Sequence, residues 1–190
     1  AYFATELADL FSEAAFICTV RLPYPWLRSA IDQHINVSAK NRVEDARTLR
    51  PELYNVRDRQ DYPEEERALA QACVWNLDAY LEFWNDHYTR VLDAIPSERL
   101  LLLRTDRLSD SISLIETFLD LPPSSLSRSQ NHVNRSPKRH NVLRGVSSDY
   151  LEEKIDSGCI QTIHRICDHL HPSQRPDEFM RRWRSVPESL

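Results

Sequence analysis

Glycine is nearly absent from this chain of 190 residues, which contains only Gly145 and Gly158. A glycine-rich loop that cradles a phosphate needs several glycines close together, so the chain cannot build one from its own residues. Long hydrophobic runs are missing too, since no apolar stretch approaches the roughly 20 residues that a membrane span needs. No signal peptide is visible, and the chain opens on Ala1 inside a helical pattern. We therefore expect that the chain has no membrane span. We also expect that it is a fragment or a processed product.

Cysteine is also sparse, and the four cysteines are scattered along the chain without any C-x-x-C pair. Cys18 falls in an apolar run of strand length, and Cys73 and Cys167 fall on the apolar faces of expected helices. This pattern favours core packing over disulfides, and it predicts no metal site. A reducing compartment fits slightly better, so we expect a cytoplasmic location, although the cysteines do not exclude a lumenal one.

The overall charge is acidic, with a formal net charge of −5. This balance argues against a general nucleic-acid binder, which usually carries a basic surface. Hydrophobic residues make up 41% and charged residues 28%, which suits one globular domain over residues 1–190. Residues 127–146 reverse the local sign, because they concentrate arginines with Lys138 and Arg139, and this reversal predicts an anionic partner.

A short strand that ends in an arginine is the most informative local pattern. The apolar run that begins at Phe16 stops at Arg21, prolines then force a turn, and a helical pattern begins near Pro25. Arg21 should lie at the carboxyl edge of a strand, where open α/β sheets bind ligands, with Ser29 about one turn into the next helix. A guanidinium and a hydroxyl at this place suit a phosphate. The alternative is that Arg21 forms a structural ion pair with a nearby carboxylate.

The remaining patterns predict an alternation of helices and strands. The predicted helices span 2–13, 25–36, 63–95, 109–119 and a segment from Ser147 or Ser148 with a break at Gly158, and the predicted strands span 15–21 and 100–103. This order implies a parallel sheet with helical crossovers. Trp84 and the tyrosines of the 63–95 helix are predicted to form a core stripe rather than line a cofactor. Residues 37–62 show no periodicity and are expected to form an irregular loop, which is a candidate for the acceptor-side lid.

Three segments together resemble the sulfotransferases that use 3′-phosphoadenosine 5′-phosphosulfate as donor. They are Arg21 to Ser29, the leucine strand ending at Thr105-Asp106, and the segment from Leu143 to Tyr150. The resemblance covers about residues 14–170. It implies that Arg21 and Ser29 hold the donor's 3′-phosphate, that Arg144 and Gly145 add donors to it, and that Thr105 faces the adenine. In the third segment Leu143 and Ser148 depart from the family's Arg and Gly, so this match is partial.

The resemblance also implies a fold and a reaction. The expected fold is α/β, a helix-rich, P-loop nucleotide-kinase-like sulfotransferase fold whose parallel sheet has helices on both faces. The family's loop for the 5′-phosphosulfate, with its Lys, lies before the strand-end Arg, so we expect the N-terminal part of the domain to be missing here. The implied reaction transfers a sulfuryl group to a hydroxyl or amine without a metal. The catalytic base is unknown, because His34, His132 and His140 carry no distinguishing pattern.

Two other functions stay open from the sequence alone. The chain could be a non-catalytic sulfotransferase-like module that binds a nucleotide or a partner. It could also be a helical interaction domain built on the 63–95 helix.

Overall fold

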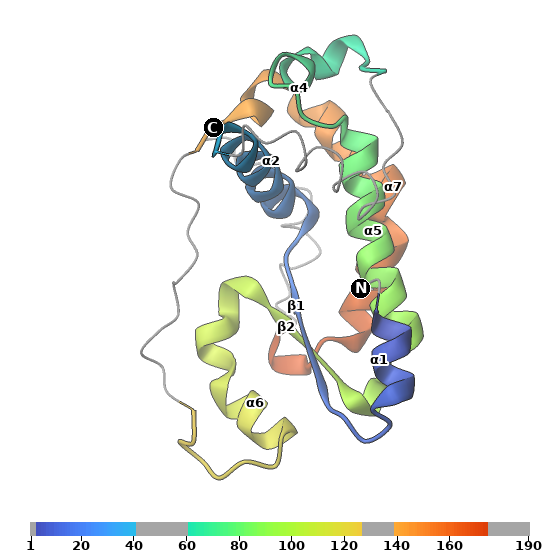
Figure 1. Ribbon diagram of the computed structural model, residues 1–190, viewed down its shortest axis with the longest axis vertical. Coiled ribbons are helices and arrows are strands. Elements are labelled where there is room, and N and C mark those ends of the chain that lie inside the picture. The colour runs from blue at the N-terminus through green and yellow to red at the C-terminus, as the bar shows by residue number, and fades with distance from the viewer. Residues whose placement is uncertain (1–2, 41–60, 127–138, 175–190) are drawn as a thin grey trace. The chain divides into compact units, whose positions relative to one another are not determined.

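The computed structural model describes residues 3–40, 61–126 and 139–174, with side chains of 37–40 left aside (Figure 1). The chain divides into two compact units. Unit 1 consists of Ala1–Arg21, Asp86–Arg135 and Gln161–Phe179. Unit 2 consists of Leu22–Asn85, Ser136–Ile160 and Met180–Leu190.

A parallel pair of strands forms the centre of unit 1. Strand β1 (Phe16–Val20) pairs with β2 (Leu100–Arg104) in a register that sets Phe16 against Leu100 and Val20 against Arg104. The predicted parallel pairing is therefore confirmed. Strand β2 is buried at every position, as a continuous apolar run should be in a parallel sheet. Strand β1 differs, because Ile17 is 41% exposed and Val20 is its one buried residue.

Short helices accompany this sheet in unit 1. Helix α1 (Ala4–Leu10) buries Ala4 and Ala8, whereas the large apolar residues of its sequence pattern are exposed. The helix predicted at 109–119 is shorter, because a 3₁₀ segment, η3 (Thr105–Ser111), comes before α6 (Ile112–Phe118). In Figure 1 the strands run between α6 on one side and α1 on the other. Unit 1 is thus a mixed α/β arrangement with a small sheet.

Helix α2 (Pro23–Lys40) opens unit 2 and is longer than predicted. It begins two residues before Pro25, because Leu22 accepts the first helical bond, 3.0 Å from the Trp26 nitrogen. Proline is well placed in a first turn, where backbone N–H groups have no helical partner. The helix also continues to Lys40, so the first residues of the predicted 37–62 loop are helical. Residues 41–60 of that loop lie outside the described residues.

The single helix predicted over 63–95 is wrong, since the chain breaks it into three pieces. They are η1 (Glu64–Glu66), α4 (Arg67–Gln71) and α5 (Leu77–Ala94). The break falls at Cys73, whose φ of 52° lies in the left-handed region that side chains disfavour. Asn76 then caps α5, since its Oδ1 accepts the Ala79 N–H at 2.9 Å. Cys73 is therefore exposed in a turn rather than on an apolar helix face.

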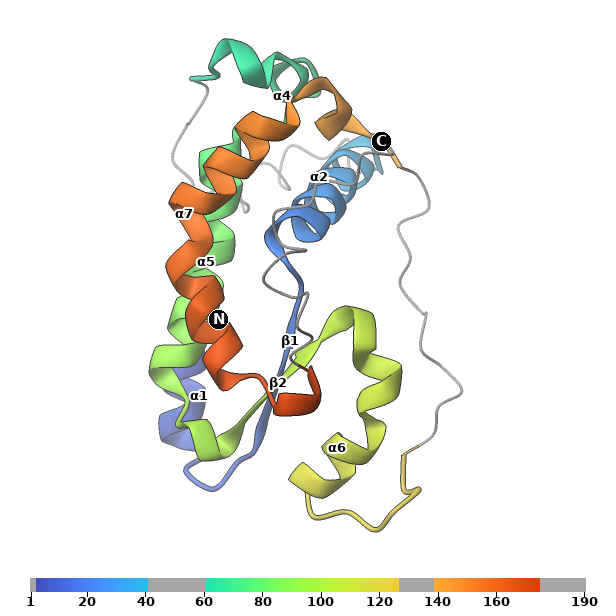
Figure 2. The ribbon, with the colours of Figure 1, turned by 180° about the vertical axis from the view of Figure 1, so that it is seen from behind.

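Helices α5 and α7 (Ser148–His169) form a parallel pair, which Figures 1 and 2 both show. In unit 2 the Lys154 ammonium lies 2.8 Å from Asp78. In unit 1 the Thr162 and Thr89 hydroxyls lie 3.2 Å apart. Gly158 does not break α7, contrary to the prediction, because helical bonding continues through it.

The core stripe predicted for α5 is confirmed, because Tyr80, Trp84 and Tyr88 are all buried. Cysteine packing is confirmed only in part. All four thiols are free, Cys159 is fully buried, and Cys18 and Cys167 are half-buried. Burial raises the pKa of the Cys159 thiol to about 12 and that of Cys18 to about 11. No helix in the described ranges is long and apolar enough to cross a membrane.

Candidate functional site

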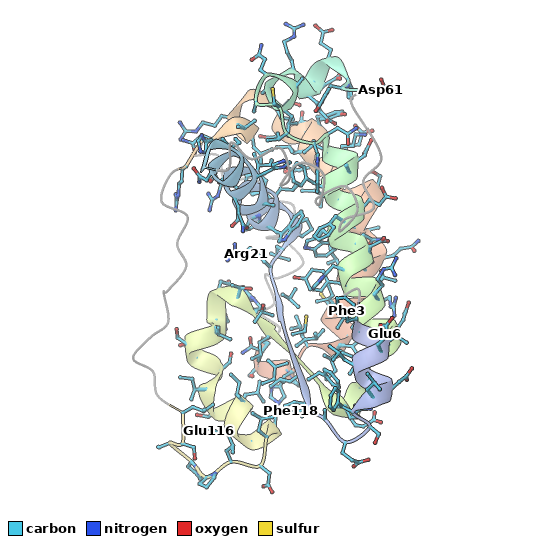
Figure 3. The ribbon with its side chains drawn as sticks, viewed as in Figure 1. Phe3, Glu6, Arg21, Asp61, Glu116 and Phe118 are labelled. Carbon is cyan, nitrogen blue, oxygen red and sulfur yellow. The ribbon has the colours of Figure 1, made fainter. Side chains whose placement is uncertain are left out.

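Arg21 follows directly after β1, at the strand's carboxyl end, as predicted (Figure 3). Its backbone N–H donates to the Tyr88 hydroxyl at 3.3 Å, and that hydroxyl donates to the Thr19 carbonyl at 3.2 Å. Burial raises the pKa of Tyr88 to about 12, so the phenol stays protonated and able to donate. The end of β1 is thereby fixed to α5 through a residue that the sequence pattern marked only as core.

Thr105 lies at the carboxyl end of the neighbouring strand, β2. Its hydroxyl donates to the carbonyl of Val20 at 3.0 Å. This bond holds Thr105 against the residue that precedes Arg21. The structure therefore brings together Arg21 and Thr105, both in unit 1, as parallel strand ends should.

Arg104, the last residue of β2, serves the fold of unit 1. Its guanidinium is buried and pairs with Asp106 through two bonds, of 3.1 and 2.5 Å. Partial burial opposes the charged carboxylate, but the Arg104 hydrogen bonds and charge lower the pKa of Asp106 overall. Gln174 joins the same residue from the backbone side, since its side-chain oxygen accepts the backbone N–H of Arg104 at 3.3 Å. The Asp106 carboxylate thus neutralises this cation at the strand end.

Unit 2 holds the other predicted binding residues. Ser29 is half-buried in the second turn of α2. Arg144 and Gly145 end a short 3₁₀ helix, η4 (Val142–Gly145), which packs on α2 and α4. Gly145 fits there because a Cβ atom at its position would come within 2.6 Å of the Ala68 Cβ. Glycine at 145 is thus required by packing on α4, a role that its sequence context did not indicate.

A buried carboxylate anchors the segment before η4 on α2. Asp32 is buried, and its Oδ1 accepts the backbone N–H of His140 at 2.8 Å. The His140 ring nitrogen Nε2 lies 2.9 Å from Asn36 Oδ1. Arg139 is exposed beside this anchor. Lys138 and the rest of the basic segment 127–138 lie outside the described residues.

The histidines named as possible bases have different surroundings. His34 Nδ1 lies 2.7 Å from the Tyr80 hydroxyl, and its ring meets Trp75 edge-on with centroids 5.2 Å apart. His140 bonds Asn36, as described above, and His132 lies outside the described residues. Nothing distinguishes one of them as the base, so that role stays unassigned.

The Asp149-Tyr150 pair lies in the first turn of α7, and Tyr150 serves as an anchor within unit 2. Ser147 caps the helix, since its Oγ accepts the Tyr150 N–H at 3.2 Å. The Tyr150 hydroxyl donates to Glu66 at 3.0 Å, and the other oxygen of this buried carboxylate accepts the Leu77 N–H at 2.8 Å. Burial, then the bond to Glu66, raise the pKa of Tyr150 to about 12. Glu66 therefore joins η1, α5 and α7, which the acidic run around it did not reveal.

Comparison with known proteins places the chain in a family. The family model described as a sulfotransferase domain matches residues 1–125. The chain belongs to the sulfotransferase family. The match includes Arg21, Ser29 and Thr105 and ends before Arg144 and Gly145. No curated protein and no solved structure matches the chain.

Membership of this sulfotransferase family supports a transferase that moves a sulfuryl group. The predicted family is therefore confirmed, over a range that starts and ends earlier than the expected 14–170. Over the described part of the chain, no group of three or more histidine, cysteine or acidic side chains could hold a metal ion.

Proposed function

We propose that this chain acts in the transfer of a sulfuryl group from 3′-phosphoadenosine 5′-phosphosulfate to a hydroxyl or amine acceptor. The observation that carries the proposal is the match to the sulfotransferase domain over the segment that contains Arg21 and Ser29. The secondary structure around these two residues supports the proposal, because Arg21 follows a parallel strand and Ser29 lies in the next helix.

The donor's 3′-phosphate is the group that these side chains suit. Arg21 and Ser29 each contribute to its binding, the first with a charged planar fork of donors and the second with a single hydroxyl. Arg144 adds charge, and the backbone N–H of Gly145 is a further donor. Thr105 lies beside the adenine. A 3′-phosphate separates this donor from other adenine nucleotides, so these residues determine donor specificity.

The proposed fold is the P-loop nucleotide-kinase-like sulfotransferase fold, with residues 1–190 as a single, partial domain of it. The parallel pairing of β1 with β2 and the helices that connect them support this assignment. No residue of the chain is assigned to the 5′-phosphosulfate, since two glycines do not make a backbone cradle for it.

The chemistry is an in-line transfer at sulfur. The bond from sulfur to the 5′-phosphate oxygen breaks, a bond from sulfur to the acceptor oxygen or nitrogen forms, and the acceptor's proton passes to a base. The leaving group is adenosine 3′,5′-bisphosphate. Positioning and charge stabilisation supply most of the rate, as they do in phosphoryl transfer.

Calorimetry with adenosine 3′,5′-bisphosphate tests the proposed binding residues. Arg21→Ala should weaken binding by roughly 10- to 150-fold, the equivalent of about 1.5–3 kcal/mol for a hydrogen bond to a charged group. Arg90→Gln is the matched control in unit 1, because Arg90 is exposed and forms a helix-surface pair with Asp86. Unchanged affinity in a folded Arg21→Ala protein would contradict the proposal.

A further inference from the structure

We propose that Tyr24 and Arg28 of α2 form, together with Arg144, an anion-binding site in unit 2 that receives the 3′-phosphate of the donor. The inference rests on the proposed function and extends it, because neither Tyr24 nor Arg28 belongs to the residues that the resemblance to sulfotransferases assigns. It makes both of them determinants of donor specificity.

Tyr24 is the first observation that points to a ligand. Its side chain is 3% exposed, and its hydroxyl is buried without a hydrogen-bond partner. Folded proteins pair nearly all of their buried polar groups, because an unpaired one has lost its water without any compensation. A bound anion would explain a hydroxyl at this position, because an oxygen of the anion would accept the missing hydrogen bond.

The placement of Arg28 is the second observation. Tyr24, Arg28 and Asp32 are spaced four residues apart, so they lie in one row along α2. Tyr24 belongs to the first turn of this 18-residue helix, where the helix dipole favours negative charge. Arg28 is half-buried one turn further along. The row thus presents a hydroxyl and a cation at the positive end of a helix.

The segment from His140 to Arg144 adds a second cation to this row. His140 is fixed to Asp32 at the far end of the row, and η4 packs on α2. Burial raises the pKa of Tyr24, and the charges of Arg28 and Arg144 oppose this rise, so both guanidinium groups act on the same phenol. The segment is thus held on α2 by the bond to Asp32 and by the packing of η4, and it carries Arg144, whose charge acts on the Tyr24 phenol.

Neither guanidinium is neutralised by the described side chains. Within the described ranges the structure shows no ion pair and no hydrogen bond for the side chain of Arg28 or of Arg144, although the backbone N–H of Arg144 bonds the Asn141 carbonyl. The nearby carboxylate of Asp32 is occupied by the His140 N–H through Oδ1. Two cations beside an unpaired hydroxyl match the charge and the acceptor oxygens of a phosphate monoester. Because the hydroxyl is covered, binding requires a neighbouring group to move aside.

The test compares nucleotide affinity with stability in matched variants of the 190-residue chain. Tyr24→Phe removes only an unpaired hydroxyl, so its thermal unfolding midpoint without nucleotide should equal or exceed that of the unaltered chain. Its affinity for adenosine 3′,5′-bisphosphate should fall about tenfold, because a hydrogen bond to a charged group is lost. Arg28→Gln should show a similar loss, and Arg28→Lys should recover part of it. Arg67→Gln, at an exposed arginine of unit 2, is the control for lost charge.

Adenosine 5′-phosphate serves as the second probe, because it distinguishes failure of this inference from failure of the proposed function. If the unaltered chain prefers the bisphosphate but Tyr24→Phe and Arg28→Gln bind it normally, the inference is wrong and the proposed function stands. If the chain binds both nucleotides equally, the inference and the proposed 3′-phosphate site are both wrong. A large loss of stability in Tyr24→Phe would show that the hydroxyl serves the fold, which also contradicts the inference.

Discussion

At the scale of single residues, two buried tyrosines have hydroxyls with opposite surroundings. The Tyr88 hydroxyl has an N–H donor from Arg21 and a carbonyl acceptor at Thr19, whereas the Tyr24 hydroxyl has neither. Replacement of tyrosine by phenylalanine should therefore affect stability differently at the two sites. At Tyr88 the replacement leaves two backbone groups unpaired, whereas at Tyr24 it removes the unpaired hydroxyl itself.

Tyr88→Phe should lower the free energy of unfolding by roughly 1–3 kcal/mol, because the Arg21 N–H and the Thr19 carbonyl lose a partner in a part-buried place. It should also weaken binding of adenosine 3′,5′-bisphosphate, since the backbone of Arg21 is no longer held. Urea unfolding followed by circular dichroism measures the first effect and calorimetry the second. Equal stability of the Tyr88→Phe and unaltered proteins would show that this hydroxyl does not hold the end of β1.

The sequence could predict some of these residues but not others, for a physical reason. Arg21 was predictable, because a strand, a proline turn and a helix are all encoded within a few neighbouring residues. Tyr88 and Glu66 were not, because their partners lie far along the chain, at Thr19 and Tyr150. Their local patterns, an apolar stripe and an acidic first turn, are the same whether or not such a partner exists.

At the scale of elements, the break between α4 and α5 shows where periodicity misleads. Apolar spacing of three and four residues continues across 63–95, so it predicts one helix. The left-handed backbone at Cys73 ends the first piece, and two side chains then support the start of α5, Asn76 as its cap and Glu66 as acceptor of the Leu77 N–H. Side-chain bonds of this kind are not encoded in hydrophobic spacing.

Glu66→Ala should lower the free energy of unfolding by roughly 2–4 kcal/mol, because two hydrogen bonds to a buried charged group are lost. Glu64→Ala is the matched control two residues away, since the Glu64 side chain is 83% exposed and pairs only at the surface with Arg67. The control should change stability by no more than about 0.5 kcal/mol. Similar losses for the two variants in denaturant unfolding would rule out the proposed role of Glu66.

The two glycines should respond to alanine in opposite directions. At Gly145 a new Cβ would meet the Ala68 Cβ at 2.6 Å, so Gly145→Ala must displace η4 from α4 and should reduce stability. At Gly158 the nearest atom would be the Leu81 Cβ at 3.7 Å, an ordinary contact between α7 and α5. Gly158→Ala should therefore raise stability by about 0.5–1 kcal/mol through helix propensity. If the thermal unfolding midpoints of the two variants shifted in the same direction, the different packing roles of Gly145 and Gly158 would be contradicted.

At the scale of the whole molecule, the order of helices and strands was predictable and the division into two units was not. Parallel pairing follows from two apolar runs joined by a long helical connection, because such strands need a crossover. The units each combine segments from three separate parts of the chain, so no local change in composition marks their limits. The predicted binding residues divide accordingly, with Arg21 and Thr105 in unit 1 and Ser29, Arg144 and Gly145 in unit 2.

The family assignment rests on a match over residues 1–125, and the binding residues rest on their motifs within and beyond that range. What distinguishes the proposed donor from other adenine nucleotides is its 3′-phosphate. The side chains of Arg21 and Ser29, and those of Tyr24, Arg28 and Arg144, are proposed to recognise that one group. The central claim can therefore be tested on the unaltered chain without knowledge of the acceptor.

The most direct measurement is calorimetric titration of the 190-residue chain with adenosine 3′,5′-bisphosphate and, separately, with adenosine 5′-phosphate. The two nucleotides differ only in the 3′-phosphate. We predict that the bisphosphate binds at least about tenfold more tightly, because charge-assisted hydrogen bonds to that phosphate are worth about 1.5 kcal/mol or more. The difference should shrink as salt is added, since part of it is electrostatic. Equal affinities for the two nucleotides would contradict the account.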